Sequence, residues 1–203
     1  MIVRPLDRED LDQMDSWSPS NDPLLALWGV PQSDPISRSI WFSMYISDPS
    51  RLWYSIDRRS DGVLMGTISL RDIIHAASAR LGISFGPEYV DLGYGTESLR
   101  VFLPHYFGQM GFAALVLDVA AANRRAVHVY EKLGFAHAGS HYRDAAEGVN
   151  LSFLELERYR PLRGTFRCRF GHTQILFYDM TLDRAAWDKA ERALTKQTAA
   201  PRS

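Results

Sequence analysis

The residues whose types and spacing point to chemistry gather in two short segments. The first covers residues 86–97, Gly-Pro-Glu-Tyr-Val-Asp-Leu-Gly-Tyr-Gly-Thr-Glu, and it follows a predicted strand and opens a predicted helix. Gly93 and Gly95 have no side chain, so the backbone can turn tightly there and approach a ligand closely. Amides at the start of a helix have no intrahelical partner, and together with the helix dipole they favour an anion such as pyrophosphate.

A Gly-x-Gly turn by itself is also compatible with a plain strand-to-helix connection. The third glycine of a dinucleotide-binding fingerprint is missing, and no Gly-Lys-Ser/Thr follows as in a Walker loop. The segment therefore predicts an anion cradle of another kind, or a turn without a ligand.

The second segment covers residues 123–135, in which Asn123 is a good N-cap for a helix. Gly134 suits the left-handed position after the helix, which places Phe135 against the last turn and against Tyr130. The direction of the tyrosine side chain would thus be fixed. The alternative interpretation is that Tyr130 is a core aromatic residue whose hydroxyl is satisfied.

Several predicted elements must position these segments. Strands are expected at residues 2–6, 51–57, 63–70, 80–85, 114–119, 137–142 and 174–182, and helices at 96–110, 124–133 and from 183 onward. Pro104 lies inside the helix at 96–110, so a kink or break is expected there. The order of elements predicts one α/β (α+β) domain over residues 1–194, with a mixed, mostly antiparallel sheet and helices on both faces. Residues 144–166 form an insertion that fits neither period, and 195–203 are expected to be a disordered tail.

Composition narrows the class of protein. The chain has 203 residues, 46% of them hydrophobic, and a net charge of −1, so nothing indicates nucleic acid or an anionic membrane as a partner. Cys168 is the single cysteine, which excludes an intrachain disulfide and a cysteine metal cluster, and no metal is expected. No signal peptide or membrane span is evident, so a cytoplasmic location is expected.

Both segments together, in this order and separation, resemble the GNAT superfamily of acyl-CoA N-acyltransferases. The first is similar to the superfamily's pyrophosphate-binding motif, and the second to its helix motif ending in Tyr-Glu-Lys-Leu-Gly-Phe. The resemblance covers about residues 1–143 and 172–194 and is nearest to the branch that includes the ribosomal-protein N-terminal acetyltransferases. It implies that two central strands, 80–85 and 114–119, splay apart to hold acetyl-CoA.

The resemblance also implies roles for individual residues. The main chain at Phe85 would bind pantetheine, Asn123 would hydrogen-bond the same arm, and Tyr130 would be the general acid that protonates the leaving thiolate. The amides that would bind pyrophosphate are those of Leu92, Gly93, Tyr94, Gly95 and Thr96. The acceptor would be a primary amine, either a protein N-terminus or a small molecule, which attacks the thioester directly.

The chain departs from the family's pattern just before the glycines. Val90 and Asp91 stand where an Arg or Gln followed by Gly is usual. A carboxylate beside pyrophosphate is repulsive by about 1 kcal/mol at about 4 Å in water. We therefore expect Asp91 to point away or CoA affinity to be reduced, with Arg100, Arg124 and Arg125 as possible compensating cations.

No general base stands out in the sequence. Asp72, Glu88, His75 and Ser84 follow or end predicted strands, but each is as readily explained as a solvated side chain. Tryptophans at positions 17, 28 and 41 are expected near the acceptor site, or else in the core. Two other functions stay open at this point, a non-catalytic acyl-CoA binder and a domain without a ligand, and the insertion is a possible homodimer contact.

Overall fold

The computed structural model describes residues 1–20, 22–27, 34–146 and 149–199. Its strands are β1 (Ile2–Pro5), β2 (Leu52–Asp57), β3 (Leu64–Ile74), β4 (Ser78–Phe85), β5 (Ala114–Ala120), β6 (Ala136–Asp144), β7 (Phe166–Arg169) and β8 (His172–Asp183). Its α-helices are α1 (Arg8–Asp15), α2 (Pro23–Ala26), α3 (Pro35–Ile46), α4 (Tyr94–Pro104), α5 (Arg124–Lys132) and α6 (Arg184–Ala199). Short helices η1 (Pro87–Tyr89), η2 (His105–Gln109), η3 (Ser152–Glu155) and η4 (Arg160–Thr165) complete the described elements.

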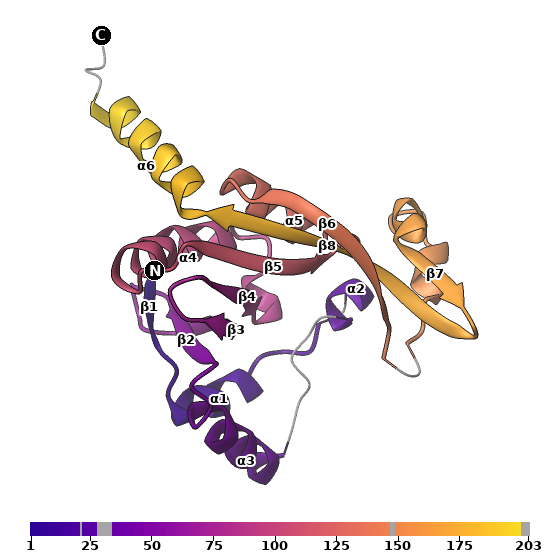
Figure 1. Ribbon diagram of the computed structural model, residues 1–203. Coiled ribbons are helices and arrows are strands. Elements are labelled where there is room, and N and C mark those ends of the chain that lie inside the picture. Colours follow the sequence, from indigo (N-terminus) through magenta and orange to yellow (C-terminus); the bar gives the residue numbers. More distant parts are fainter. Residues whose placement is uncertain (21, 28–33, 147–148, 200–203) are drawn as a thin grey trace.

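One sheet organises the molecule, with the strand order β1-β2-β3-β4-β5-β8-β6 and β7 added beside β8. Only the β4–β5 pair is parallel, and every other described pair is antiparallel. Figure 1 shows the long β8 running past β5 and β6, with α6 at one end and β7 at the other. The predicted mixed, mostly antiparallel single-domain fold is therefore confirmed.

Alternation along β2 shows which helices cover which face. Ser55 points to α1, where its hydroxyl lies 2.5 Å from the carboxylate of Asp10. Its neighbour Tyr54 points the other way and packs edge-on against Phe102 of α4. Because side chains alternate across a strand, α1 and α4 lie on opposite faces of the sheet. Helix α5 contacts α4, and its Tyr130 belongs to the same hydrophobic core.

Pro104 ends α4 as expected, and the chain continues as a single π-helical turn, η2. Proline has no N–H and cannot continue a regular α-helical ladder, which accounts for the change. The turn places Tyr106 in the core, where its hydroxyl donates to the carbonyl of Ala114 at 2.6 Å and accepts from the amide of Ala79 at 2.9 Å. Tyr106 thus joins β4 and β5 at the end where they pair.

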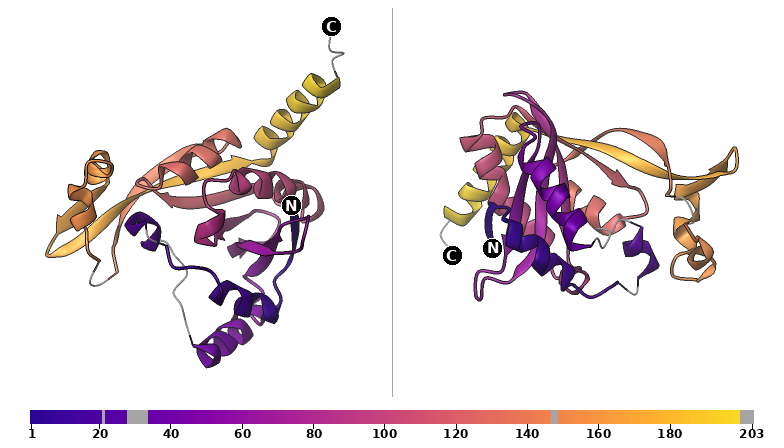
Figure 2. Two further views of the ribbon diagram at one scale, coloured as in Figure 1. Left: turned by 180° about the vertical axis from the view of Figure 1, so that it is seen from behind. Right: turned by 90° about the horizontal axis from the view of Figure 1, so that it is seen from below.

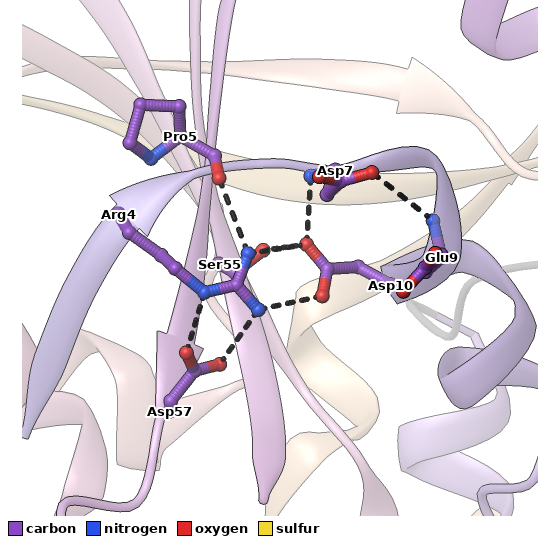
Figure 3. Close-up of polar contacts among 7 residues, drawn as sticks. All are labelled: Arg4, Pro5, Asp7, Glu9, Asp10, Ser55 and Asp57. Atoms are coloured by element: carbon purple, nitrogen blue, oxygen red, sulfur yellow. Dashed lines mark hydrogen bonds and ion pairs between the residues drawn. The ribbon is translucent and has the colours of Figure 1, made fainter. Parts of the chain in front are cut away.

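A cluster of charged side chains links β1, α1 and β2 by ion pairs and hydrogen bonds (Figure 3). The guanidinium of Arg4 binds both oxygens of Asp10, at 2.7 and 2.8 Å, and Asp57 at 2.7 Å. Asp10, which is 1% exposed, also accepts from the amide of Asp7 in a capping box. We call Arg4, Asp10, Ser55 and Asp57 the Arg4 cluster, and it joins β1, α1 and β2.

The insertion packs as a small second core. Side chains from α2, the end of β5 and the insertion gather there, namely Leu24, Ala122, Phe153, Leu154, Tyr159 and Leu162. The Tyr159 hydroxyl donates to Asp22 at 2.8 Å, and Arg124 donates to the carbonyl of Pro161 at 3.1 Å. Figure 2 shows this region beside α2 and away from α6. The insertion therefore contacts the start of α5.

The last helix extends further than expected. Helix α6 continues to Ala199, so residues 195–199 are helical, while 200–203 lie outside the described residues. Trp187 of α6 stacks on Phe107 of η2. In the part of the chain that the structure describes, no helix combines the length and the apolarity that crossing a membrane requires.

Candidate active site

Strands β4 and β5 pair over only three rungs and then separate. The rungs join Ser78 to Ala114, Ala79 to Leu115 and Arg80 to Val116. Beyond them β5 keeps its antiparallel pairing with β8, and β4 keeps its pairing with β3. The two strands thus form a V that opens toward Phe85 and Ala120, as the family resemblance implied. Backbone groups that line the open part of the V face a space instead of a neighbouring strand.

The glycine turn lies at the open end of the V. Gly93 is the N-cap of α4 and has φ +83°, a conformation that glycine adopts without steric cost. Among the described residues, the amides of Leu92, Gly93, Tyr94, Gly95 and Thr96 donate no hydrogen bond. These amides at a helix N-terminus suit an anion, so the residues present fit the pyrophosphate of CoA.

Asp91 lies in this loop and has a cationic partner. It has φ +65°, a left-handed conformation that aspartate tolerates better than most residues but that glycine prefers. Its carboxylate lies 2.6 Å from the Nη1 atom of Arg125, at the start of α5. Asp22 adds a second carboxylate 3.9 Å from the same guanidinium. Of the three arginines considered from the sequence, Arg125 is the one that compensates the charge of Asp91.

Helix α5 is capped at both ends as expected. The Asn123 side chain accepts from the amide of Ala126 at 3.3 Å, which leaves its amide hydrogens for another acceptor. Gly134 has φ +91°, and the amide of Phe135 donates to the carbonyl of Tyr130 at 3.0 Å. The rings of Tyr130 and Phe135 lie 5.5 Å apart. These contacts fix the tyrosine on the last turn of α5.

Tyr130 as a residue is 6% exposed, and its hydroxyl has no hydrogen-bond partner among the described residues. The hydroxyl oxygen is itself accessible to solvent, since the one buried side-chain polar atom without a partner in the described part of the chain is Ser98 Oγ. Burial, and then the negative charge of Asp118, raise the pKa of this hydroxyl well above its usual range. The group therefore stays protonated at neutral pH. A protonated phenol without a partner has a proton to donate, and the interpretation that its hydroxyl is satisfied within the core loses support.

Asp118 is a buried carboxylate that the sequence motifs did not indicate. Leu115, Leu117 and Val119 of β5 face the core shared with α4 and α5. Asp118 alternates with them and so points to the opposite face of the V, the face that carries α1. No local pattern marks an aspartate in the middle of an apolar strand as functional, and its partners come from three other strands.

Three arginines converge on Asp118. Arg143 of β6 approaches it at 2.7 Å, Arg80 of β4 at 2.8 Å and Arg71 of β3 at 3.3 Å. The Asp118 side chain is 4% exposed, whereas the arginines keep 31–43% of theirs exposed. Burial opposes ionisation, but the bond from Arg143 and the three cationic charges lower the pKa of Asp118 below its usual range. We call Asp118 and these three arginines the Asp118 cluster.

The general bases considered from the sequence are not gathered in the V. Asp72 is exposed and binds the Nε atom of Arg80 at 3.1 Å, and the side chains of Glu88 and His75 are exposed. Ser84 shares a hydrogen bond of 3.0 Å with Thr67. No group of three or more metal-ligating side chains occurs in the described ranges.

Of the three tryptophans expected near the acceptor site or in the core, the structure describes the side chain of Trp17. The indole of Trp17 packs on Gly86, so closely that a Cβ added there would lie 2.9 Å from the ring. Trp17 therefore lies beside the loop that follows β4. Trp28 falls outside the described residues, and so does the side chain of Trp41.

A groove of about 520 Å³ lies between α5 and residues of β6 and β8. It is lined by Ala121, Arg124, Val127, Glu131, His137 and Tyr178. Neither Asn123 nor the glycine turn contributes to it, so the groove does not belong to the predicted cofactor site.

Comparisons with known proteins agree with this geometry. The model of the acetyltransferase (GNAT) domain family matches residues 1–136. Spermidine N(1)-acetyltransferase of Escherichia coli K12 is 30% identical over 142 residues, which are 68% of this chain and 73% of that protein. The relatives found are spermidine acetyltransferases, so the resemblance to the ribosomal-protein branch stays a prediction.

Solved structures show the same fold. Spermidine N-acetyltransferase of Vibrio cholerae in complex with CoA and spermine superposes with a TM-score of 0.67 at 20% identity, covering 92% of this chain and 96% of that one. A dodecameric structure of the Vibrio cholerae enzyme superposes with a TM-score of 0.61 at 20% identity, covering 91% and 94%. Family model and fold agree, and the chain belongs to the GNAT family as an acetyl-CoA-dependent N-acetyltransferase.

Proposed function

We propose that the chain transfers the acetyl group of acetyl-CoA to a primary amine by direct attack, with Tyr130 as general acid. The amine nitrogen would form a bond to the thioester carbon, and the carbon–sulfur bond would then break. The sulfur would leave as a thiol because Tyr130 supplies its proton, and the excess proton on nitrogen would pass to water. The phenolate would regain a proton from solvent.

One observation supports the role of Tyr130 most. Its ring is buried, and its hydroxyl is protonated and without a partner among the described residues, on a helix turn that Gly134 and Phe135 hold in place. General acid catalysis needs a positioned proton donor, and it contributes roughly 10²–10⁴-fold to a rate. The side-chain N–H groups of Asn123 are left free by the helix cap and support binding of the pantetheine part of the donor. The backbone amides around Gly93 that donate no hydrogen bond support binding of its pyrophosphate part.

The test is the variant Tyr130→Phe, which keeps the ring and removes the proton. We expect kcat to fall by about 100-fold or more, with the dissociation constant for CoA unchanged. Tyr178→Phe is the matched control, since its hydroxyl lies on β8 in the separate groove. Full turnover by Tyr130→Phe would exclude the acid role. Spermidine, the acceptor named for the Escherichia coli relative, is the first amine to assay with labelled acetyl-CoA, followed by peptides with a free N-terminus.

The alternative function is a non-catalytic acyl-CoA binder. The observation that favours it is the lack of a positioned general base among the candidates. The side chains of Asp72, Glu88 and His75 are all exposed, and none lies in the V. A binder would be stabilised by CoA without releasing free thiol in the presence of any amine. Thiol release measured with and without acceptor separates the two functions.

A further inference from the structure

We infer that the Asp118 cluster selects an acceptor whose primary amine is joined to an anionic group, a carboxylate or a phosphate. The inference rests on the proposed function and narrows its acceptor. It concerns Arg71, Arg80 and Arg143, which surround Asp118 at the V.

The position of the cluster follows from the two faces of the sheet. Helices α4 and α5, with Tyr130 between them and the sheet, cover one face of the V. An acceptor amine must therefore reach the thioester from the opposite face. Asp118 points to that face two residues beyond Val116, the last residue of β5 that pairs with β4. The arginines bound to Asp118 consequently lie where the remote end of an acceptor would lie.

The chemistry of the cluster is an excess of hydrogen-bond donors. Each guanidinium carries a planar fork of N–H groups and accepts nothing. Arg71 uses one nitrogen on Asp118, Arg80 uses two on Asp118 and Asp72, and Arg143 uses two on Asp118 and His141. The remaining N–H groups have no acceptor among the described residues, and all three side chains are part exposed.

Other charged groups on this face do not reverse that excess. Asp72 is exposed at its edge, and Asp179 of β8 accepts from His141 at 3.0 Å. The lowered pKa of Asp118 keeps this carboxylate ionised, and its oxygens already hold the three arginines. Arg143 also lies over the ring of Phe177, at 4.6 Å from its centroid, which keeps the guanidinium close to the sheet. The three carboxylates Asp72, Asp118 and Asp179 balance the charge of the three arginines, so the selection rests on hydrogen bonding. A carboxylate or phosphate can accept from the free guanidinium N–H groups, whereas an ammonium group is itself only a donor.

The experiment compares two acceptors of equal length that differ only at the remote end, 5-aminopentanoate and 1,5-diaminopentane. We expect kcat/KM to favour the aminocarboxylate by about tenfold or more, the range for one hydrogen bond to a charged group. Arg143→Gln and Arg71→Gln should each remove most of this preference, and Arg143→Lys should keep part of it. Arg59→Gln, in the exposed turn before β3, is the matched control. A third acceptor, an aminoalkylphosphonate, shows whether carboxylate or phosphate is preferred.

Binding is measured separately from turnover. Calorimetry of 5-aminopentanoate with the CoA-bound protein should show affinity that Arg143→Gln weakens by about tenfold. Such binding without acetyl transfer would contradict the proposed function and leave this inference standing. A preference for the diamine, or a preference for the aminocarboxylate that neither glutamine variant changes, would overturn this inference and leave the acetyltransferase function intact. Thermal unfolding of each variant confirms that it is folded.

Discussion

The Arg4 cluster and the Asp118 cluster both join arginine to aspartate, but in opposite proportions. In the first, one arginine lies between two buried carboxylates, Asp10 and Asp57, and Ser55 and a backbone amide complete the hydrogen bonds of Asp10. In the second, one buried carboxylate holds three part-exposed arginines. The Arg4 side chain is 37% exposed, much as these three are, so the clusters differ in how far the donors are used rather than in arginine burial. Donors that are all bonded to protein groups contribute to structure, whereas spare donors are available to a ligand.

Position strengthens this difference. The Arg4 cluster joins β1, α1 and β2 at one edge of the sheet, far along the strand order from β5. The Asp118 cluster draws its arginines from β3, β4 and β6, on both sides of the V. We therefore expect substitutions in the first to change stability alone, and substitutions in the second to change acceptor kinetics.

The largest change in stability is expected for Asp10→Asn. It leaves Arg4 with half its partners and removes a buried charge that accepts four hydrogen bonds from Arg4, Ser55 and Asp7. We expect a loss of about 3 kcal/mol in the free energy of unfolding, measured by urea denaturation, with kcat/KM unchanged at a temperature where the variant is folded. Glu9→Gln, an exposed neighbour, should change neither quantity. An altered acceptor preference in Asp10→Asn would break the comparison.

Asp118→Asn should cost less stability and more selectivity. The partners of Asp118 are all part-exposed arginines that water can solvate after the carboxylate is lost, whereas Asp10 also accepts from the buried Ser55 hydroxyl and from the Asp7 amide. We therefore expect a loss of about 1–2 kcal/mol. The guanidiniums would no longer be held together, so the preference for an anion-bearing acceptor should fall severalfold. Kinetics with the matched pair of acceptors and urea denaturation give both quantities. Unchanged kinetics would make the Asp118 cluster purely structural.

Acid should weaken both clusters. Burial opposes ionisation of Asp10 and Asp118, but their arginine partners lower both pKa values below the ordinary range. A carboxyl whose folded pKa is depressed contributes stability that is present above its unfolded pKa of about 3.9 and is lost as the pH falls through the folded value. We expect the free energy of unfolding to decrease below about pH 4, with a shallower decrease in Asp10→Asn than in the wild type. Equal slopes would show that Asp10 does not contribute.

The smallest effect is expected at the pair formed by Asp91 and Arg125, both part exposed. Asp91→Asn removes a charge beside the anion loop and frees Arg125 for pyrophosphate, so CoA should bind about fivefold tighter, or about 1 kcal/mol. Arg125→Gln should weaken binding by a similar factor, and Arg100→Gln, on the exposed side of α4, should not. Calorimetry at low and high salt checks this, because screening should shrink both effects.

The donor side of the V was predictable from the sequence, and the acceptor side was not. The signals for Gly93, Asn123, Tyr130 and Gly134 are local, since caps and left-handed turns depend on neighbouring residues. Asp118 has no such signal. The contacts of Asp118 depend on which strands lie near β5. The strand order, with β4 on one side of β5 and β8 and β6 on the other, determines those contacts and cannot be seen in the local sequence.

The compensation of Asp91 illustrates the same limit. The sequence indicated a misplaced charge and three possible cations, but the contact with Arg125 depends on the angle between α5 and the glycine turn. The insertion likewise had no readable period, because its two short helices pack on α2 and Ala122 as well as on one another. Tertiary contacts decided all three cases.

A crystal structure of the protein with CoA tests the central claim most directly. The account predicts pyrophosphate on the amides around Gly93, the sulfur within hydrogen-bonding distance of the Tyr130 hydroxyl, and the Asp118 cluster across the V from that hydroxyl. CoA bound in the groove beside Tyr178, or a sulfur separated from Tyr130 by other side chains, would contradict it.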